Sequence, residues 1–156
     1  MAKESERKFL VRGDAWRNLA TASAAIRQFY LVASEDRTLR VRLKEGQAIL
    51  TLKLGAAAWQ RDEFEYPISI TEAQEMEPFA LGTVIEKTRH LVTHRDHLYE
   101  VDEFAGALAG LVLAELETPE HVADADLPPW LGREVTGDAT FYNASLALRG
   151  LPETIP

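Results

Sequence analysis

Acidic and basic side chains alternate near the start of the chain. Glu4, Glu6 and Lys8 occupy every second position of residues 4–11. In an extended strand these three side chains project from one face. Charged groups are tolerated against an apolar core only when they are paired, hydrogen-bonded or bound to a metal. We therefore expect this face either to be solvated or to hold a charged ligand.

Similar charges recur on one face of most of the expected strands. The full set is Glu4, Glu6, Lys8, Arg40, Arg42, Lys53, Glu63, Glu65, Lys87, Arg89, Asp102, Glu115 and Glu117. Solvated strand faces also carry charges, but they mix in Ser, Thr, Gln and Asn, whereas here acids and bases separate by strand. Guanidinium and ammonium groups bind phosphate oxygens, and carboxylates hold Mg²⁺ or Mn²⁺. The set suits a linear polyanion bound together with divalent cations.

The strands that would carry these residues are marked by alternation of apolar and polar residues. The clearest example is the hairpin expected over residues 38–54, where Leu39 and Val41 alternate with Arg40 and Arg42. This pattern predicts a hairpin with an apolar side and a cationic side. The other expected strands cover residues 4–11, 26–32, 61–68, 83–92, 98–104 and 110–117.

Eight strands at regular spacing predict a mainly β fold, an eight-stranded antiparallel closed barrel with flanking helices. Asp14 can cap a short helical stretch, and Thr71 opens a capping-box pattern. Thr118 followed by Pro119 predicts a further helix start. No linker or repeat interrupts the chain, so we expect one domain over residues 1–156, with C-terminal helices at about 119–150 packed on the barrel.

Composition limits the function further. The 156 residues contain 46% hydrophobic and 27% charged residues, which is typical of a soluble globular protein. The absence of cysteine excludes disulfides, thiolate catalysis and zinc–cysteine sites. A net charge of -8 argues against binding of nucleic acid by a general basic field. No apolar run is long enough to span a membrane and no signal-peptide pattern is present, so we expect a cytoplasmic protein that binds neither nucleic acid nor membrane.

Several motifs in order resemble the CYTH superfamily, also called triphosphate tunnel metalloenzymes. They are Glu4-x-Glu6-x-Lys8, Arg40-Val41-Arg42, Thr51-Leu52-Lys53, Glu63-Phe64-Glu65, Glu86-Lys87-Thr88-Arg89, Glu100-Val101-Asp102 and Glu115-Leu116-Glu117. The resemblance covers residues 4–117, and residues 128–143 are similar to the tail of the short bacterial members.

The resemblance implies an eight-stranded tunnel that binds a triphosphate, requires Mg²⁺ or Mn²⁺ and, in short bacterial members, hydrolyses inorganic tripolyphosphate by a metal-activated water. By similarity, the phosphate chain would be bound by Lys8, Arg40, Arg42, Lys53, Lys87 and Arg89. The metal ions would be held by Glu4, Glu6, Asp102, Glu115 and Glu117. Lys8 and Glu117 are the predicted catalytic residues, and Glu63, Glu65 and Tyr30 would support the tunnel.

The resemblance leaves alternatives open. Thiamine or nucleoside triphosphate hydrolysis and class IV adenylyl cyclase activity use the same tunnel, and a non-catalytic polyphosphate-binding module is a third class. The His-Phe pair of class IV cyclases is absent near the opening motif, which argues against cyclisation. Residues 141–148 also lack the basic residue that some members carry on the last helix, and Arg149 is the candidate replacement. Some tunnel proteins are dimers, so a homodimer is compatible with the resemblance.

Overall fold

The structure is a computed structural model that describes residues 5–55 and 61–153. Its strands are β1 (Ser5–Val11), β2 (Ala20–Ala33), β3 (Arg37–Lys44), β4 (Gln47–Leu54), β5 (Asp62–Ile68), β6 (Leu81–His94), β7 (His97–Phe104), β8 (Val112–Thr118) and β9 (Leu131–Glu134). The α-helices are α1 (Ile70–Met76) and α2 (Asn143–Arg149), and the 3₁₀ helices are η1 (Arg17–Leu19), η2 (Glu77–Phe79), η3 (Gly106–Leu108), η4 (Asp124–Asp126) and η5 (Ala139–Phe141).

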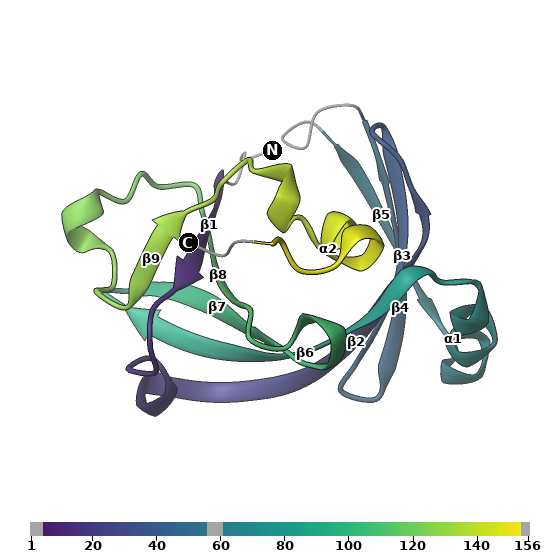
Figure 1. Ribbon diagram of the computed structural model, residues 1–156, viewed down its shortest axis with the longest axis horizontal. Helices are drawn as coiled ribbons and strands as arrows, with labels where there is room; N and C mark the ends of the chain where they lie inside the picture. Colours follow the sequence, from purple (N-terminus) through teal and green to yellow (C-terminus); the bar gives the residue numbers. More distant parts are fainter. Residues whose placement is uncertain (1–4, 56–60, 154–156) are drawn as a thin grey trace.

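The strands form one antiparallel sheet in the order β5-β4-β3-β2-β6-β7-β8-β1-β9. Figure 1 shows that the sheet curves so strongly that β3, β4 and β5 form one arm and β1, β8 and β9 form the opposite arm. Strands β2, β6 and β7 connect the two arms, and α2 lies between them (Figure 1). None of the helices in the described part of the chain has the length and apolar character needed to cross a bilayer.

The mainly antiparallel β class is confirmed, but two details differ from the expected eight-stranded closed barrel. The sheet has nine strands, because a short strand in the expected C-terminal helical region pairs with β1. Among the described residues the hydrogen-bonded order also ends at β5 and β9 instead of joining them. The segment from η5 to α2 stands between the arms, and its contacts with Lys8 and Lys87 bridge β1 and β6.

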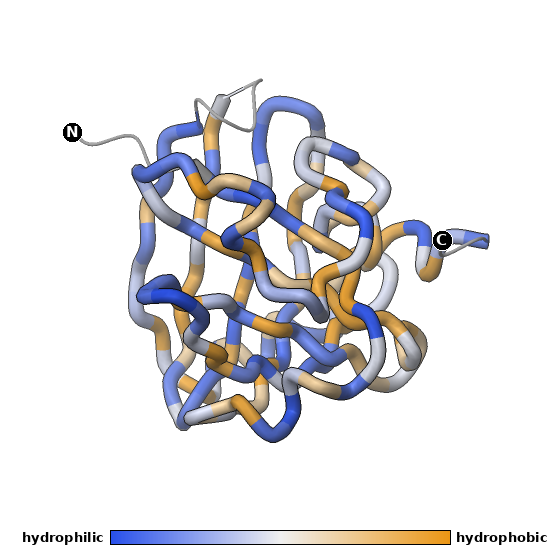
Figure 2. The backbone as a smooth tube through the Cα atoms, turned by 90° about the vertical axis from the view of Figure 1, so that its left-hand side faces the viewer, coloured by the Kyte–Doolittle hydropathy of each residue, from blue (hydrophilic) through white to orange (hydrophobic). Residues whose placement is uncertain are grey.

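The apolar side chains of the alternating sequence pattern lie on the convex side of the sheet. Phe29, Val41 and Ala48 are buried there with Ala73 of α1, as predicted for the hairpin β3–β4. A second convex cluster lies over β6, β7 and β8 and contains both Trp16 and Trp130. Figure 2 shows the corresponding short hydrophilic and hydrophobic stretches that follow one another along the strands. Much of the apolar core therefore lies outside the curve of the sheet.

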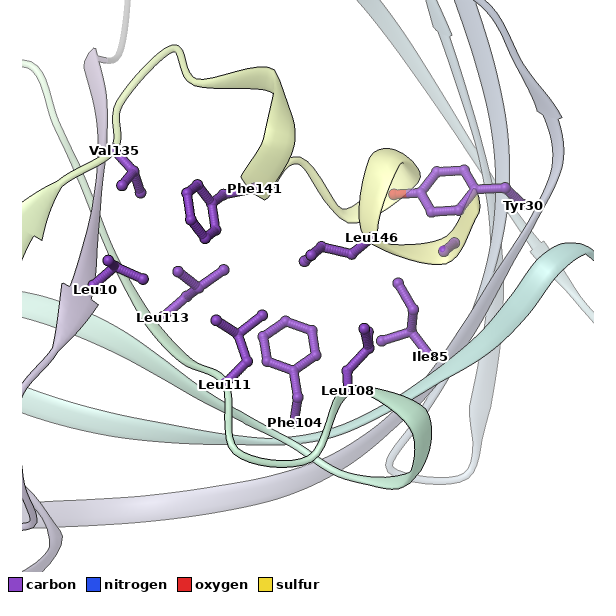
Figure 3. Close-up of a cluster of buried hydrophobic side chains, with 11 residues drawn as sticks. Leu10, Tyr30, Ile85, Phe104, Leu108, Leu111, Leu113, Val135, Phe141 and Leu146 are labelled. Atoms are coloured by element: carbon purple, nitrogen blue, oxygen red, sulfur yellow. The ribbon is translucent and has the colours of Figure 1, made fainter. Parts of the chain in front are cut away.

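The concave side is divided into an apolar part and a charged part. Figure 3 shows Phe141 and Leu146 pointing from the C-terminal segment toward Leu10 of β1, Leu113 of β8 and Ile85 of β6. All five side chains are at most 4% exposed. On each of these strands, the next residues on the concave face, two and four positions away, have charged side chains. The apolar part anchors α2 and leaves the charged part as the place for a polar ligand.

Three local predictions were wrong in detail. The N-cap of α1 is Ser69 and not Thr71: the Ser69 hydroxyl accepts from the Glu72 amide and donates to the Glu72 carboxylate. Thr118 does not begin a helix: it ends β8, and its hydroxyl accepts a hydrogen bond from the Glu120 amide in a turn. Strand β2 begins six residues before the expected start at Ile26, because its alanine-rich half pairs with β6.

Candidate active site

The charged part of the concave face is built from pairs of facing residues on neighbouring strands. Lys8 of β1 lies opposite Glu115 of β8, and Arg89 of β6 lies opposite Asp102 of β7. Directly opposed residues of an antiparallel pair project from the same face. Strand pairing therefore brings together cations and carboxylates that are far apart in the sequence.

Asp102 is the shared acceptor of two cations. One of its oxygens accepts from Lys87 Nζ at 2.7 Å and from Arg89 Nη2 at 2.9 Å, and the other accepts from Arg89 Nε at 2.8 Å. Burial raises the pKa of Asp102, but the two cations outweigh burial and hold that pKa at about 2. Burial also opposes the charge of Arg89, yet its hydrogen bonds to Asp102 raise the pKa of Arg89 above its usual value.

Burial and neighbouring cations oppose the positive charge of Lys87 and Arg42. Burial, followed by the charges of Arg89 and Arg42, lowers the pKa of Lys87 to about 8 in spite of Asp102. Burial and the charges of Arg40 and Arg89 lower the pKa of Arg42 to about 10. Two buried cations whose charge is opposed in this way form an arrangement that an anion would stabilise.

The acids of β1 and β8 crowd one another beside this positive face. Lys8 Nζ lies 3.5 Å from Glu115 Oε1 and also donates to the carbonyl oxygen of Phe141 at 3.2 Å. Desolvation and the negative charge of Glu115 raise the pKa of Glu6. The positive charge of Lys53 lowers the pKa of Glu6, even though Lys53 lies on β4 in the opposite arm. The two arms therefore face one another across the charged concave side.

The arm made of β3, β4 and β5 contributes a basic hollow of about 250 Å³. It is lined by Arg40, Arg42, Lys44, Glu45, Gln47, Ile49 and Glu65. Arg40 donates to the Thr51 hydroxyl at 3.3 Å. On β5, Glu65 lies opposite Thr51 and Glu63 lies opposite Lys53. The predicted supporting carboxylates thus lie beside the cations of β3 and β4.

The remaining predicted residues have different surroundings. Tyr30 packs in the apolar cluster around α2 (Figure 3), and burial raises the pKa of its hydroxyl, which lies beside Arg40. Glu117 is exposed opposite Glu6, and it lines a hollow of about 540 Å³ near the β6–β7 turn. Glu4 lies outside the described residues.

Sequence reasoning gave no role to three polar residues of this face. Glu100 was recognised in the motif Glu100-Val101-Asp102 but was not assigned to the site, and its carboxylate lies 3.2 Å from Arg89. Gln28 is fully buried and accepts from Arg42 Nε at 2.8 Å. Asn143 of α2 accepts from Lys87 Nζ at 3.2 Å. The last two are isolated amides, and no spacing in the sequence links them to the charged strands.

A family model described as the CYTH domain matches residues 2–150. The chain belongs to the CYTH family. An inorganic triphosphatase of Acetivibrio thermocellus is 42% identical over 147 residues, which cover 94% of each chain. An inorganic triphosphatase of Nitrosomonas europaea is 38% identical over 149 residues, covering 93% of this chain and 97% of that one. A crystal structure of an inorganic triphosphatase has a TM-score of 0.69 and 34% identity, and covers 100% of this chain and 98% of the other.

Membership of this CYTH family implies a divalent metal ion. The chemistry of the nearby acids fits such an ion, because carboxylate oxygens are the usual ligands of hard divalent cations. Desolvation and then the charge of Glu115 raise the pKa of Glu6, and a bound cation would offset both effects. Within residues 5–55 and 61–153, no three His, Asp or Glu side chains are grouped closely enough to hold a metal without rearrangement.

Proposed function

We propose that this CYTH protein is a metal-dependent triphosphatase that hydrolyses inorganic tripolyphosphate. The observation that carries the proposal is the cluster of cations Arg40, Arg42, Lys87 and Arg89 on the concave face, where burial and the neighbouring positive charges oppose the charge of Arg42 and Lys87. Full-length similarity to two inorganic triphosphatases supports the same substrate. A small linear polyanion fits a basic surface confined between two arms better than a large polyanion, which the net negative charge would repel.

The basic residues would bind and orient the phosphate chain. We assign this role to Lys8, Arg40, Arg42, Lys53, Lys87 and Arg89. They lie on β1, β3, β4 and β6, so they can contact phosphate oxygens from both arms. Asp102 aligns Lys87 and Arg89 in the structure, and we propose that it retains this alignment when substrate is bound.

The acids would hold the cofactor, Mg²⁺ or Mn²⁺. The proposed ligands are Glu6, Glu115 and Glu117 with Glu4, while the contacts of Asp102 favour its aligning role over direct metal binding. A bound divalent cation supplies Lewis acidity, which withdraws charge from phosphate oxygens and makes water more acidic.

In the proposed reaction, water attacks the terminal phosphorus and the phosphoanhydride bond to the neighbouring bridging oxygen breaks. The products are orthophosphate and pyrophosphate. Lys8 would neutralise charge that develops on the departing oxygen, because its ammonium is desolvated and close to the acids. Glu117 is exposed at the edge of this face and lines the hollow there, where it would accept a proton from the attacking water. No protein nucleophile is required.

The test is phosphate release from tripolyphosphate, ATP and thiamine triphosphate, each with Mg²⁺, with Mn²⁺ and with a chelator. We expect metal-dependent release with a preference for tripolyphosphate, and loss of at least about 100-fold in kcat for Lys8→Ala and Glu6→Ala. Arg37→Ala is the matched control, because Arg37 is on β3 but forms an exposed pair with Asp36. No phosphate release from any of the three substrates, or normal activity of Lys8→Ala, would refute the proposed function and its site.

A further inference from the structure

Two uncharged amides connect the last helix to two of the cations. Asn143 Oδ1 accepts from Lys87 Nζ at 3.2 Å and from Gln28 Nε2 at 3.3 Å. Gln28 Oε1 in turn accepts from Arg42 Nε at 2.8 Å. The hydrogen-bonded series therefore runs from Lys87 on β6 through Asn143 and Gln28 to Arg42 on β3.

The direction of this series is fixed by its two ends. Lysine and arginine can only donate hydrogen bonds, so each amide must present its oxygen to the cation that it contacts. The amide nitrogen of Gln28 is then the only side-chain group left to join Asn143. Gln28 is fully buried, and both of its polar ends are satisfied within the series. Loss of either amide would leave buried donors or acceptors without partners, which is costly.

The helix that carries Asn143 packs closely against the sheet. Leu146 and Ala147 of α2 are buried in the concave apolar cluster. The carbonyl oxygen of Ala147 lies so close to Gly82 of β6 that a Cβ on residue 82 would be 2.1 Å from it. The same segment supplies the Phe141 carbonyl that accepts from Lys8. Asn143 is thus held in a fixed place relative to the cations.

We propose that Asn143 and Gln28 are positioning residues that hold Lys87 and Arg42 in place to receive the phosphate chain. The last helix then acts on the substrate through the cations of the sheet and needs no basic residue of its own on its inward side. This inference rests on the proposed function, because it takes Lys87 and Arg42 to be phosphate ligands. It adds two uncharged residues to that site.

The test compares Asn143→Ala, Gln28→Ala and the double variant in tripolyphosphate hydrolysis. Each single variant should lower kcat/KM by about tenfold, mainly through a higher KM, since each loses a hydrogen bond that orders a charged group. The double variant should be no worse than the more affected single variant, because the two amides act as one unit. Ser145→Ala, on the same helix, should keep the wild-type KM.

Stability is measured for each variant by thermal unfolding, and calorimetric binding of tripolyphosphate in chelator is measured in parallel. Should the alanine variants fold poorly, Asn143→Leu and Gln28→Met remove the same hydrogen bonds and preserve volume. Wild-type KM in the single variants, or losses that multiply in the double variant, would overturn the inference. Wild-type protein that binds tripolyphosphate without hydrolysing it would instead refute the proposed function, and the binding data would still test the positioning role.

Discussion

Asp102 illustrates how a single residue controls the charged face. The residue is 3% exposed, and its carboxylate neutralises part of the charge of Lys87 and Arg89. Removing one member of a buried ion pair leaves an uncompensated charge, which costs more than the intact pair contributes. The residue therefore determines both the stability of this part of the sheet and the direction in which the two cations point.

We expect Asp102→Asn to lower the free energy of unfolding by on the order of 3 kcal/mol at neutral pH. The folded-state pKa of Asp102, lowered from 3.8 to about 2, means that its stabilisation is present above about pH 4 and is lost as pH falls toward 2. The variant should lack this acid-dependent component in chemical denaturation curves. Asp36→Asn, in an exposed pair, is the control and should change little. Equal effects of the two substitutions would contradict the role of burial.

Lys87 should make triphosphate binding sensitive to alkaline pH. Because the pKa of Lys87 is lowered to about 8, the free protein loses this positive charge as pH rises through that value. We expect calorimetric affinity for tripolyphosphate in chelator to weaken by about tenfold between about pH 7 and about pH 9.5. Lys87→Arg keeps its charge over this range, so its affinity should fall much less. A change in the ligand's own charge affects both proteins alike, and parallel losses would therefore exclude Lys87 as the cause.

At the scale of elements, α2 depends on one glycine. Gly82 has a φ of +61°, and a Cβ there would lie 2.1 Å from the backbone oxygen of Ala147. We expect Gly82→Ala to destabilise the fold by about 3 kcal/mol, combining left-handed strain with displacement of α2. Activity should fall with it, because Asn143 and Phe141 move with the helix.

The control for this substitution is Gly137→Ala. Gly137 has a φ of +77° but no atom within 4 Å of an added Cβ, so it isolates backbone strain from collision. It should cost only about 1–2 kcal/mol and leave kcat/KM unchanged. Thermal unfolding and steady-state kinetics of the two variants provide the comparison. Similar kinetics for the two variants would show that displacement of α2 does not affect the site.

The elements also show how far the sequence could predict the structure. Alternation placed Arg40 and Arg42 correctly opposite the apolar face, because a period of two is a local property of the strand. The helix signal at Thr118 was overridden by pairing of β8 with β1, which joins residues more than 100 positions apart. The position of α2 and the contacts of Asn143 depend on packing between distant segments, and no local pattern encodes them.

For the whole molecule, stability and ligand binding depend on different surfaces. Two apolar clusters cover the convex side, and a third holds α2 against the concave side. Burial, together with the charges of Arg40 and Arg89, lowers the pKa of Arg42, so its positive charge is unfavourable in the folded protein without a ligand. Apolar contacts therefore stabilise the fold, whereas the buried positive charges of Arg42 and Lys87 oppose it.

A bound polyanion should therefore stabilise the entire protein. At a tripolyphosphate concentration about 100 times its dissociation constant, linkage predicts a gain of roughly 2.7 kcal/mol, or a rise of about 5–10 °C in Tm. Thermal unfolding in chelator measures this gain without turnover. At that same concentration, Arg42→Ala should show a smaller shift and Arg37→Ala the full shift. An unchanged Tm of the wild-type protein at saturating ligand would contradict binding to the folded state.

The pairing of β1 with β8 has a consequence for synthesis of the protein. Ser5 lies opposite Thr118 and Leu10 lies opposite Leu113, so β1 cannot pair with β8 until a segment more than 100 residues later has been synthesised. Long-range pairing of this kind is slow, because a large loop must close before any contact is gained. Lys8 can meet Glu115 and Phe141 only after residue 141 has emerged from the ribosome. A chain that terminates before β8 therefore lacks the pairing of β1 with β8 and cannot contain the complete charged face.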